Sequence, residues 1–229
     1  SRTPIREAIR QLQQEGLVEP DRGGGLRVTV ITIADAIHLY DCRLGLEQIA
    51  AMGACENATP AQLEDLQDCL AQANLADPIV VEAESSHGSG TAGSHESVAS
   101  DSTASDSTAS DSAASDNSAE LENRLHIDQS FHRLLAESSG NPQLADLLEQ
   151  IFSKMALLRL TTTYQNPDVL EIWAEHERIV DAIVQRDSQA AAIAVRDHLV
   201  ASKARVVQAL EGLRTGLRTE ASLQGIALF

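Results

Sequence analysis

Three segments of this chain place apolar residues at helical spacing, and polar residues interrupt each apolar face. Within 119–138, Asp128 and His132 stand between leucines and are four residues apart, so they point the same way. His176 lies among isoleucines in the second segment, and His198 lies among valines and a leucine in the third. Buried polar side chains cost free energy unless they are paired, and a divalent metal ion is a suitable partner. The pattern therefore predicts helices that converge on a metal site.

The spacing of His176 and His198 predicts how two of these helices meet. Asp187 is equally far in sequence from both histidines, and it lies in a polar stretch, 185–188, suited to a tight reversal. Asp187 or Ser188 could cap the second helix. In an antiparallel helical hairpin, residues equally distant from the turn lie at the same height, so the two imidazoles should face each other. The alternative is that each histidine is separately satisfied by a hydrogen bond in the core.

Composition favours a mainly α fold. Only 3% of the 229 residues are aromatic, and alanine and leucine dominate the regular segments, which favours helix-on-helix packing. The net charge of −17 is unusual for a protein that binds nucleic acid over its whole surface. Residues 1–28, however, hold five arginines and four acidic residues. A locally basic end on an acidic body indicates a partner for that end.

The basic end has the pattern of a recognition helix followed by a wing. Thr3 and Pro4 suit the start of a helix, and Gly16 would end it. Arginines spaced by four line one side, where they can face phosphates and base edges. Two short strand-like runs then flank Gly23, Gly24 and Gly25, as expected for a hairpin. The alternative interpretation of the arginine row is an ordinary solvated helix face.

The residues of both parts resemble one family. The run SRTPIREAIRQLQQEGLV at 1–18 closely resembles the recognition helix and following strand of the GntR family of bacterial winged-helix repressors. Three further runs resemble the FadR-type branch, whose all-helical ligand-binding module is called the FCD domain. They are YDCRLGLEQIAA at 40–51, DQSFHRLLAESSGNPQL at 128–144 and EHERIVDAIVQRDSQAA at 175–191. The resemblance covers about 1–84 and 119–210.

The resemblance implies roles for particular residues. By match to the family's motif, a divalent metal would be bound by Asp128, His132, His176 and His198. Zinc is favoured for three imidazoles, with nickel, manganese or iron as alternatives. An arginine of the family's first effector-domain helix, which contacts the carboxylate of the ligand, matches Arg43; from the residues alone, Arg43 could instead pair with an internal acid. The family's DNA contacts would fall on Ser1, Arg2, Thr3, Arg6 and a wing glycine near Gly24.

The expected organisation follows from these matches. Residues 1–31 would be a remnant of a winged helix-turn-helix domain, 32–215 an FCD-like helical bundle, and 216–229 a tail. The first helix and most of the second helix of the winged domain have no counterpart here, so we expect this chain alone to bind operator DNA poorly. Residues 85–118 repeat a Ser/Asp/Ala-rich unit of five residues and are expected to be a disordered insertion. Glu84 and His87 beside it form only a weak metal candidate.

The predicted function is that of a transcriptional regulator, not an enzyme. A small carboxylate would bridge the metal and Arg43, alter the packing of the bundle and change operator affinity, in a homodimer that reads a two-fold symmetric operator. The rival interpretation is a metal-dependent hydrolase at the same site, although none of the four ligands lies in a Glu-x-x-His pair and no His-Glu-x-x-His motif is present. A third is a purely structural metal that clamps the bundle.

The remaining features indicate a cytoplasmic protein without a membrane segment. Cys42, Cys55 and Cys69 are isolated and odd in number, so we expect buried or half-buried thiols in a reducing compartment. No run of 18 apolar residues occurs, and the start has no secretory signal pattern.

Overall fold

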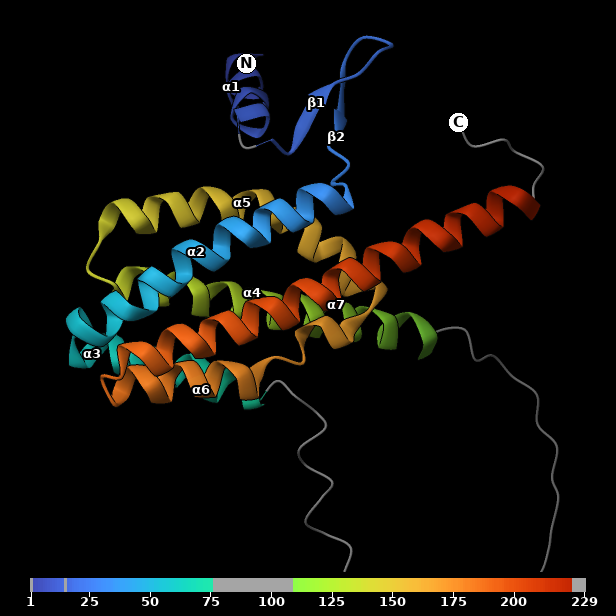
Figure 1. The fold of residues 1–229 in the computed structure, drawn as a ribbon. Coiled ribbons are helices and arrows are strands. Elements are labelled where there is room, and N and C mark those ends of the chain that lie inside the picture. Colours follow the sequence, from blue (N-terminus) through green and yellow to red (C-terminus); the bar gives the residue numbers. More distant parts are fainter. Residues whose placement is uncertain (1, 15, 76–108, 224–229) are drawn as a thin grey trace, which may run out of the picture.

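The computed structural model describes residues 2–14, 16–75 and 109–223, and it confirms the mainly α fold. Helices form the body of the molecule, and a two-stranded sheet lies near its N-terminus (Figure 1). The bundle is built from α2 (Ile33–Asn57), α3 (Pro60–Leu75), α4 (Ala109–Ser138), α5 (Pro142–Gln165), the 3₁₀ turn η2 (Pro167–Leu170), α6 (Trp173–Val184) and α7 (Ser188–Leu223).

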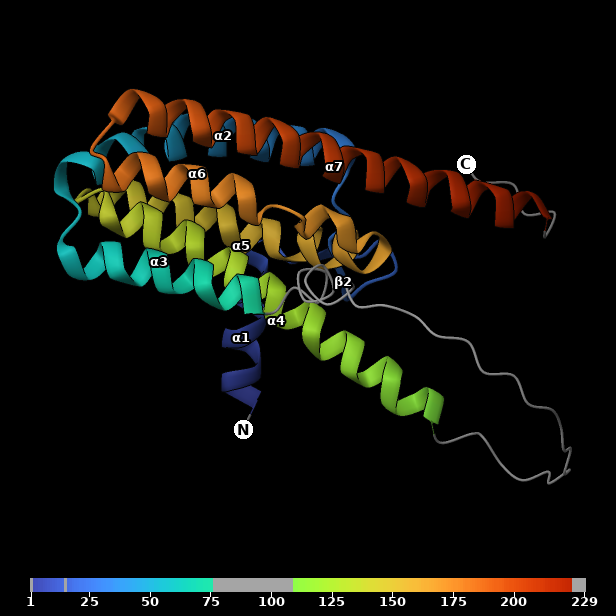
Figure 2. The ribbon, with the colours of Figure 1, turned by 90° about the horizontal axis from the view of Figure 1, so that it is seen from below.

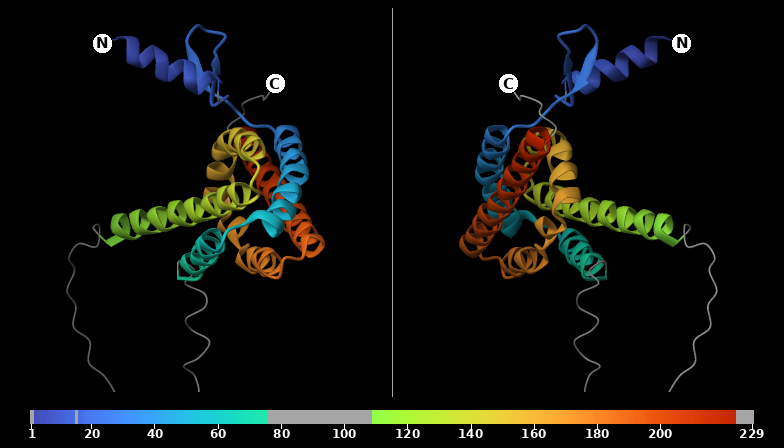
Figure 3. Two further views of the ribbon diagram at one scale, coloured as in Figure 1. Left: turned by 90° about the vertical axis from the view of Figure 1, so that its left-hand side faces the viewer. Right: turned by 90° about the vertical axis from the view of Figure 1, so that its right-hand side faces the viewer.

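The N-terminal part is a helix followed by a hairpin, as predicted. Helix α1 (Arg2–Gln14) ends before Gly16, whose φ of 76° suits a residue without a Cβ. Strands β1 (Val18–Pro20) and β2 (Leu26–Val28) pair antiparallel around a turn that contains Gly24 at φ 83°. The apolar side of α1 is left open, with Ile5 62% exposed. Figure 3 shows this part lying outside the bundle.

The bundle begins at a capping box, where the sequence predicted its first helix. The Thr32 side chain accepts a hydrogen bond from the Asp35 backbone N–H, and the Asp35 carboxylate accepts one from the Thr32 backbone N–H. This reciprocal pair satisfies two donors that a helix start leaves open. Helix α2 then packs chiefly along α7, which runs antiparallel to it and also packs on α6 (Figures 1 and 2).

The reversal between α6 and α7 occurs at the predicted residues. Arg186 adopts a left-handed backbone conformation, φ 59°, and Asp187 caps α7 by accepting a hydrogen bond from the Ala190 N–H at 2.9 Å. The Arg186 guanidinium donates to the carbonyls of Ala54, Cys55 and Ala58, at 3.3, 3.0 and 2.8 Å. These carbonyls belong to the end of α2, where a helix lacks its own donors. The α6–α7 turn is thereby fastened to the end of α2.

Three sequence expectations need correction. The last ten residues of the expected insertion at 85–118 form the first turns of α4, which begins at Ala109; their alanines favour a helix, and their serines and aspartates suit its N-terminal end. Helix α7 continues past residue 215 to Leu223 rather than giving way to a tail. Cys42 is exposed, whereas Cys55 and Cys69 are buried as expected. Residues 85–108, with His87, and Glu84 lie outside the described part.

None of the helices in the described ranges is long and apolar enough to cross a membrane.

Two glycines of α2 provide a matched test of the packing. A Cβ at Gly53 would lie 2.8 Å from the backbone oxygen of Ser139, whereas a Cβ at Gly45 would meet nothing within 4 Å. Replacing glycine by alanine within a helix raises stability by about 0.5–1 kcal/mol when there is room. We therefore expect Gly45→Ala to raise the free energy of unfolding by that amount, and Gly53→Ala to lower it by about 1–3 kcal/mol through overpacking. Urea unfolding of both variants measures this, and an equal gain in both would contradict the packing described.

Candidate metal centre

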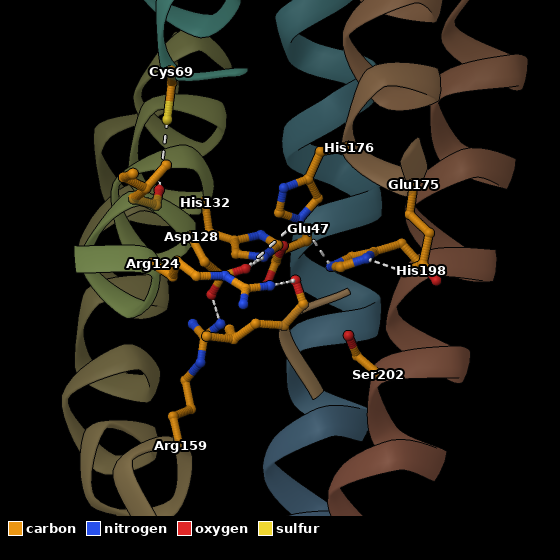
Figure 4. A network of polar contacts seen from close by, with 12 residues as sticks. Glu47, Cys69, Arg124, Asp128, His132, Arg159, Glu175, His176, His198 and Ser202 are labelled. Carbon is orange, nitrogen blue, oxygen red and sulfur yellow. Dashed lines mark hydrogen bonds and ion pairs between the residues drawn. The ribbon is translucent and has the colours of Figure 1, made fainter. Parts of the chain in front are cut away.

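Three histidines from three helices meet in the core of the bundle. His132 on α4, His176 on α6 and His198 on α7 are each no more than 1% exposed. One ligand atom from each lies within 4.8 Å of the others. Phe131 stacks on the His176 ring with centroids 3.9 Å apart, which fixes the plane of that imidazole. Figure 4 shows the three rings and Asp128 pointing toward one another.

The distances between the ring nitrogens suit a metal ion. His176 Nε2 lies 3.4 Å from His198 Nε2, so these imidazoles face each other as their symmetric spacing predicted. Asp128 Oδ1 lies 3.5 Å from His132 Nε2 and 3.7 Å from His176 Nε2. Ligands of a tetrahedral site with metal–nitrogen bonds of about 2.1 Å are separated by about 3.4 Å. The structure therefore brings all four predicted residues together, with Asp128 close to two of the three histidines.

Two carboxylates orient the imidazoles from outside. His132 Nδ1 lies 2.7 Å from Glu47 Oε2, and His198 Nδ1 lies 2.7 Å from Glu175 Oε2. When Nδ1–H donates to a carboxylate, Nε2 keeps its electron pair and faces the centre. Sequence reasoning missed both glutamates. Glu47 follows Arg43 by one helical turn, which is a usable signal, but Glu175 gave none because its partners come from α7.

Arg43 is buried on α2, but its main partner is an acid of its own helix. Its Nε donates to Glu47 Oε1 at 2.5 Å, and its guanidinium carbon lies 5.5 Å from the centre of the Phe152 ring. This is the internal pairing that the sequence left open. The Nη2 atom of Arg43 has no hydrogen-bond partner among the described residues. Arg43 is therefore connected to the centre only indirectly, because it binds Glu47 and Glu47 binds His132. Its Nη2 group remains available to a ligand.

A second arginine, which the sequence did not reveal, contacts the centre directly. Arg159 of α5 forms an ion pair with Asp128 through Nη2 and Oδ2, and 14% of its side chain is exposed (Figure 4). The other carboxylate oxygen of Asp128 and the Nε2 of His132 have no hydrogen-bond partner in the described part. Two buried polar atoms are thus left facing the centre, and a bound cation would satisfy both.

Burial keeps the imidazoles neutral. It lowers the pKa of His198 to about 4, against the opposing effect of the hydrogen bond to Glu175. Burial and the neighbouring His198 hold the pKa of His176 well below its ordinary value, and burial also lowers that of His132. Neutral imidazoles are the form that binds metals.

The outer glutamates remain charged. Burial acts to raise the pKa of Glu47, but the charges and hydrogen bonds of Arg43 and His132 outweigh it and hold that pKa well below its usual range. Burial likewise acts to raise the pKa of Glu175, but hydrogen bonds from His198 and Arg205 lower it to about 2. The three imidazoles are therefore neutral donors, and charged glutamates lie behind two of them.

The residues expected to contact DNA lie apart from this centre. Thr3 and Arg6 are exposed on α1, and Gly24 lies at the exposed tip of the hairpin. Arg2 opens α1, while Ser1 lies outside the described residues. The helix and the hairpin are adjacent, which is the arrangement of a recognition helix and wing.

Comparison with known proteins gives a consistent family. Residues 98–201 match the FCD domain. The chain is 26% identical over 191 residues to the uncharacterised HTH-type transcriptional regulator YdhC of Bacillus subtilis, covering 83% of this chain and 68% of that protein. It is 37% identical over 70 residues to the Nta operon transcriptional regulator of Aminobacter aminovorans, covering 31% of this chain and 33% of that protein.

Solved structures show the same fold. McbR/YncC of Escherichia coli superposes with a TM-score of 0.66 at 18% identity, covering 91% of this chain and 81% of that one. A GntR-family transcriptional regulator from Pseudomonas syringae superposes with a TM-score of 0.54 at 19% identity, covering 94% and 73%. These relatives are described as transcriptional regulators, which favours a regulator over an enzyme. The chain is therefore similar to GntR-type transcriptional regulators, and its residues 98–201 match the FCD domain.

Proposed function

We propose that the helical domain binds a divalent cation through Asp128, His132, His176 and His198, and that a small carboxylate at this centre changes the affinity of the protein for operator DNA. The observation that carries the proposal is the convergence of three buried imidazoles, two of them held from behind by carboxylates. A hydrogen-bonded histidine core without a metal would not leave Asp128 Oδ1 and His132 Nε2 without partners.

The donor set suits zinc best. Three neutral imidazoles and one carboxylate match its preference for nitrogen and oxygen donors in a four-coordinate site, while nickel, manganese and iron accept the same donors. An anionic ligand would need a further position, which zinc provides by expanding to five-coordinate and the other cations provide in six-coordinate geometry. Arg43 is proposed to assist, because its unpartnered Nη2 is a charged donor that a carboxylate would satisfy.

The route from the centre to DNA runs through α2. This helix carries Arg43 and Glu47, and residues 29–32 connect its start to the hairpin. A ligand that binds one packing of the bundle more tightly would shift the placement of α1 and the hairpin, where Arg2, Thr3, Arg6 and Gly24 are proposed to contact DNA, together with Ser1. Coupling of about 1–3 kcal/mol between the two sites is ordinary for such systems.

A homodimer is part of the proposal. Ile49 of α2 and Ile193 of α7 are 56% and 42% exposed. The Gln48 side chain donates to the Ala192 carbonyl at 3.2 Å, which places these isoleucines at the same level of two packed helices. Exposed apolar residues on adjacent helices suit a two-fold contact, and two subunits would present two recognition helices to a palindromic site.

Zinc titration of the metal-free chain by calorimetry tests the central claim. We expect one site per chain, and loss of binding in His176→Ala. His126→Ala is the matched control, because His126 is exposed on α4 and lies outside the cluster. Undiminished zinc binding in His176→Ala would show that the metal lies elsewhere.

Glu47→Gln tests the outer carboxylate. The amide keeps the shape but removes the charge that orients His132, so we expect zinc affinity to fall about 10- to 100-fold. Glu149→Gln serves as the control, because Glu149 pairs with Arg133 on the partly exposed surface between α4 and α5. Calorimetry measures the dissociation constant of zinc for each variant. Equal constants for the two variants would contradict the role assigned to Glu47.

The stability of the metal-free protein should depend on pH. Because the folded pKa of His198 is about 4 against an ordinary 6.5, the unfolded chain binds more protons between these values. Stability is thus fully present above about pH 6.5 and falls as the pH drops toward 4, by about 3 kcal/mol from this residue alone. Urea unfolding in the presence of a chelator measures the loss. His198→Gln should flatten the curve and the exposed His38→Gln should not; an unchanged curve in His198→Gln would refute the assignment.

A further inference from the structure

A pocket of about 500 Å³ lies between the hairpin and the bundle. The hairpin side contributes Leu17, Val18 and Val28, and the bundle side is formed by residues of α4 and α5. Its lining is mainly apolar, and its size falls within the range of small-molecule sites. None of the three histidines lines it. The pocket is therefore a separate compartment next to the metal centre.

Arg159 connects the two compartments. Its side chain lines the pocket, and its guanidinium reaches Asp128 of the centre. Phe152 also lines the pocket, and its ring lies 6.1 Å from that of His132. The acid among the lining residues, Glu122, accepts a hydrogen bond from the Tyr164 hydroxyl at 3.0 Å. Among the described residues, Asp128 is the acid that forms an ion pair with Arg159.

We propose that Arg159 exchanges carboxylates: it pairs with Asp128 when the centre holds no cation, and with the carboxylate of an effector in the pocket when a cation is bound. This inference rests on the proposed metal site and names the effector contact and its chemical class. When Asp128 binds a cation, its carboxylate charge is engaged by that cation and no longer neutralises Arg159. A largely buried guanidinium without a counterion is costly, and its planar fork suits a carboxylate.

The pocket also defines the class of effector. Glu122, His126 and Gln129 also line the pocket, but Arg159 is its one guanidinium and most of the other lining residues are apolar. This lining fits a monocarboxylate with a compact apolar body. Such a molecule would contact α4 and α5 on one side and the hairpin on the other. Arg43 does not line this pocket, whereas Arg159 does. The effector would then act on the hairpin directly as well as through α2.

Benzoate, with benzamide as its uncharged counterpart, is a probe of this chemistry. We expect calorimetry to show benzoate binding to the zinc-loaded chain, much weaker binding to the metal-free chain, and no binding of benzamide. Arg159→Gln should weaken benzoate binding about 10- to 100-fold, as expected for loss of a charge-assisted contact. Arg196→Gln is the control, because Arg196 pairs with its neighbour Asp197 on the surface. No benzoate binding to the zinc-loaded chain at millimolar concentration would overturn the proposal.

Two further measurements separate this proposal from the metal site itself. Arg159→Gln should raise zinc affinity, because it removes a cation that competes for Asp128; a lower zinc affinity would mean that Arg159 supports the centre, and would overturn the exchange. Ala156→Phe fills the pocket without touching the ion pair, and should block benzoate while zinc still binds. If zinc binds and Arg43→Gln, but not Arg159→Gln, abolishes benzoate binding, the metal site stands and this inference fails.

Discussion

The structure depends on burying three imidazoles, those of His132, His176 and His198, together with the carboxylate of Asp128. The imidazoles must stay neutral, and the carboxylate must stay paired. Removing these groups from water is unfavourable unless each finds a partner. The chain meets this demand on the outer side with Glu47 and Glu175, which bind the Nδ1 atoms of His132 and His198. On the inner side the Nε2 atoms are left facing one another, and this asymmetry makes the core a binding site rather than a satisfied network.

The outer acids are themselves paired, so the charge balance extends to a second layer. Glu47 is shared between His132 and Arg43, and Glu175 between His198 and Arg205. Asp128 completes the set through Arg159. Glu47 and Glu175 each join one histidine to one arginine, whereas Asp128 pairs with its arginine directly. In two of the three cases the arginine and the inner residue lie on different helices, so charge pairing also fixes how the helices are arranged.

The sequence was sufficient for the features that repeat along a helix. The apolar stripes located the helices that carry Asp128, His132, His176 and His198, and the symmetric spacing about Asp187 placed two of the histidines opposite each other. Glu175 and Arg159 could not be found in this way, because their partners come from other helices and no spacing within one helix reports such a contact. The start of α4 at Ala109 was missed for another reason. The Ser/Asp repeat is typical of disordered segments, but its alanines favour a helix where the segment continues into a packed helix.

The contact of Arg186 with the end of α2 has a mechanical consequence. Arg186 donates to three carbonyls at the end of α2, so we expect the α6–α7 turn and this end of α2 to move together. Movement between the sensing core and the hairpin is then concentrated at the other end of α2, where the short linker at 29–31 meets the Thr32 cap.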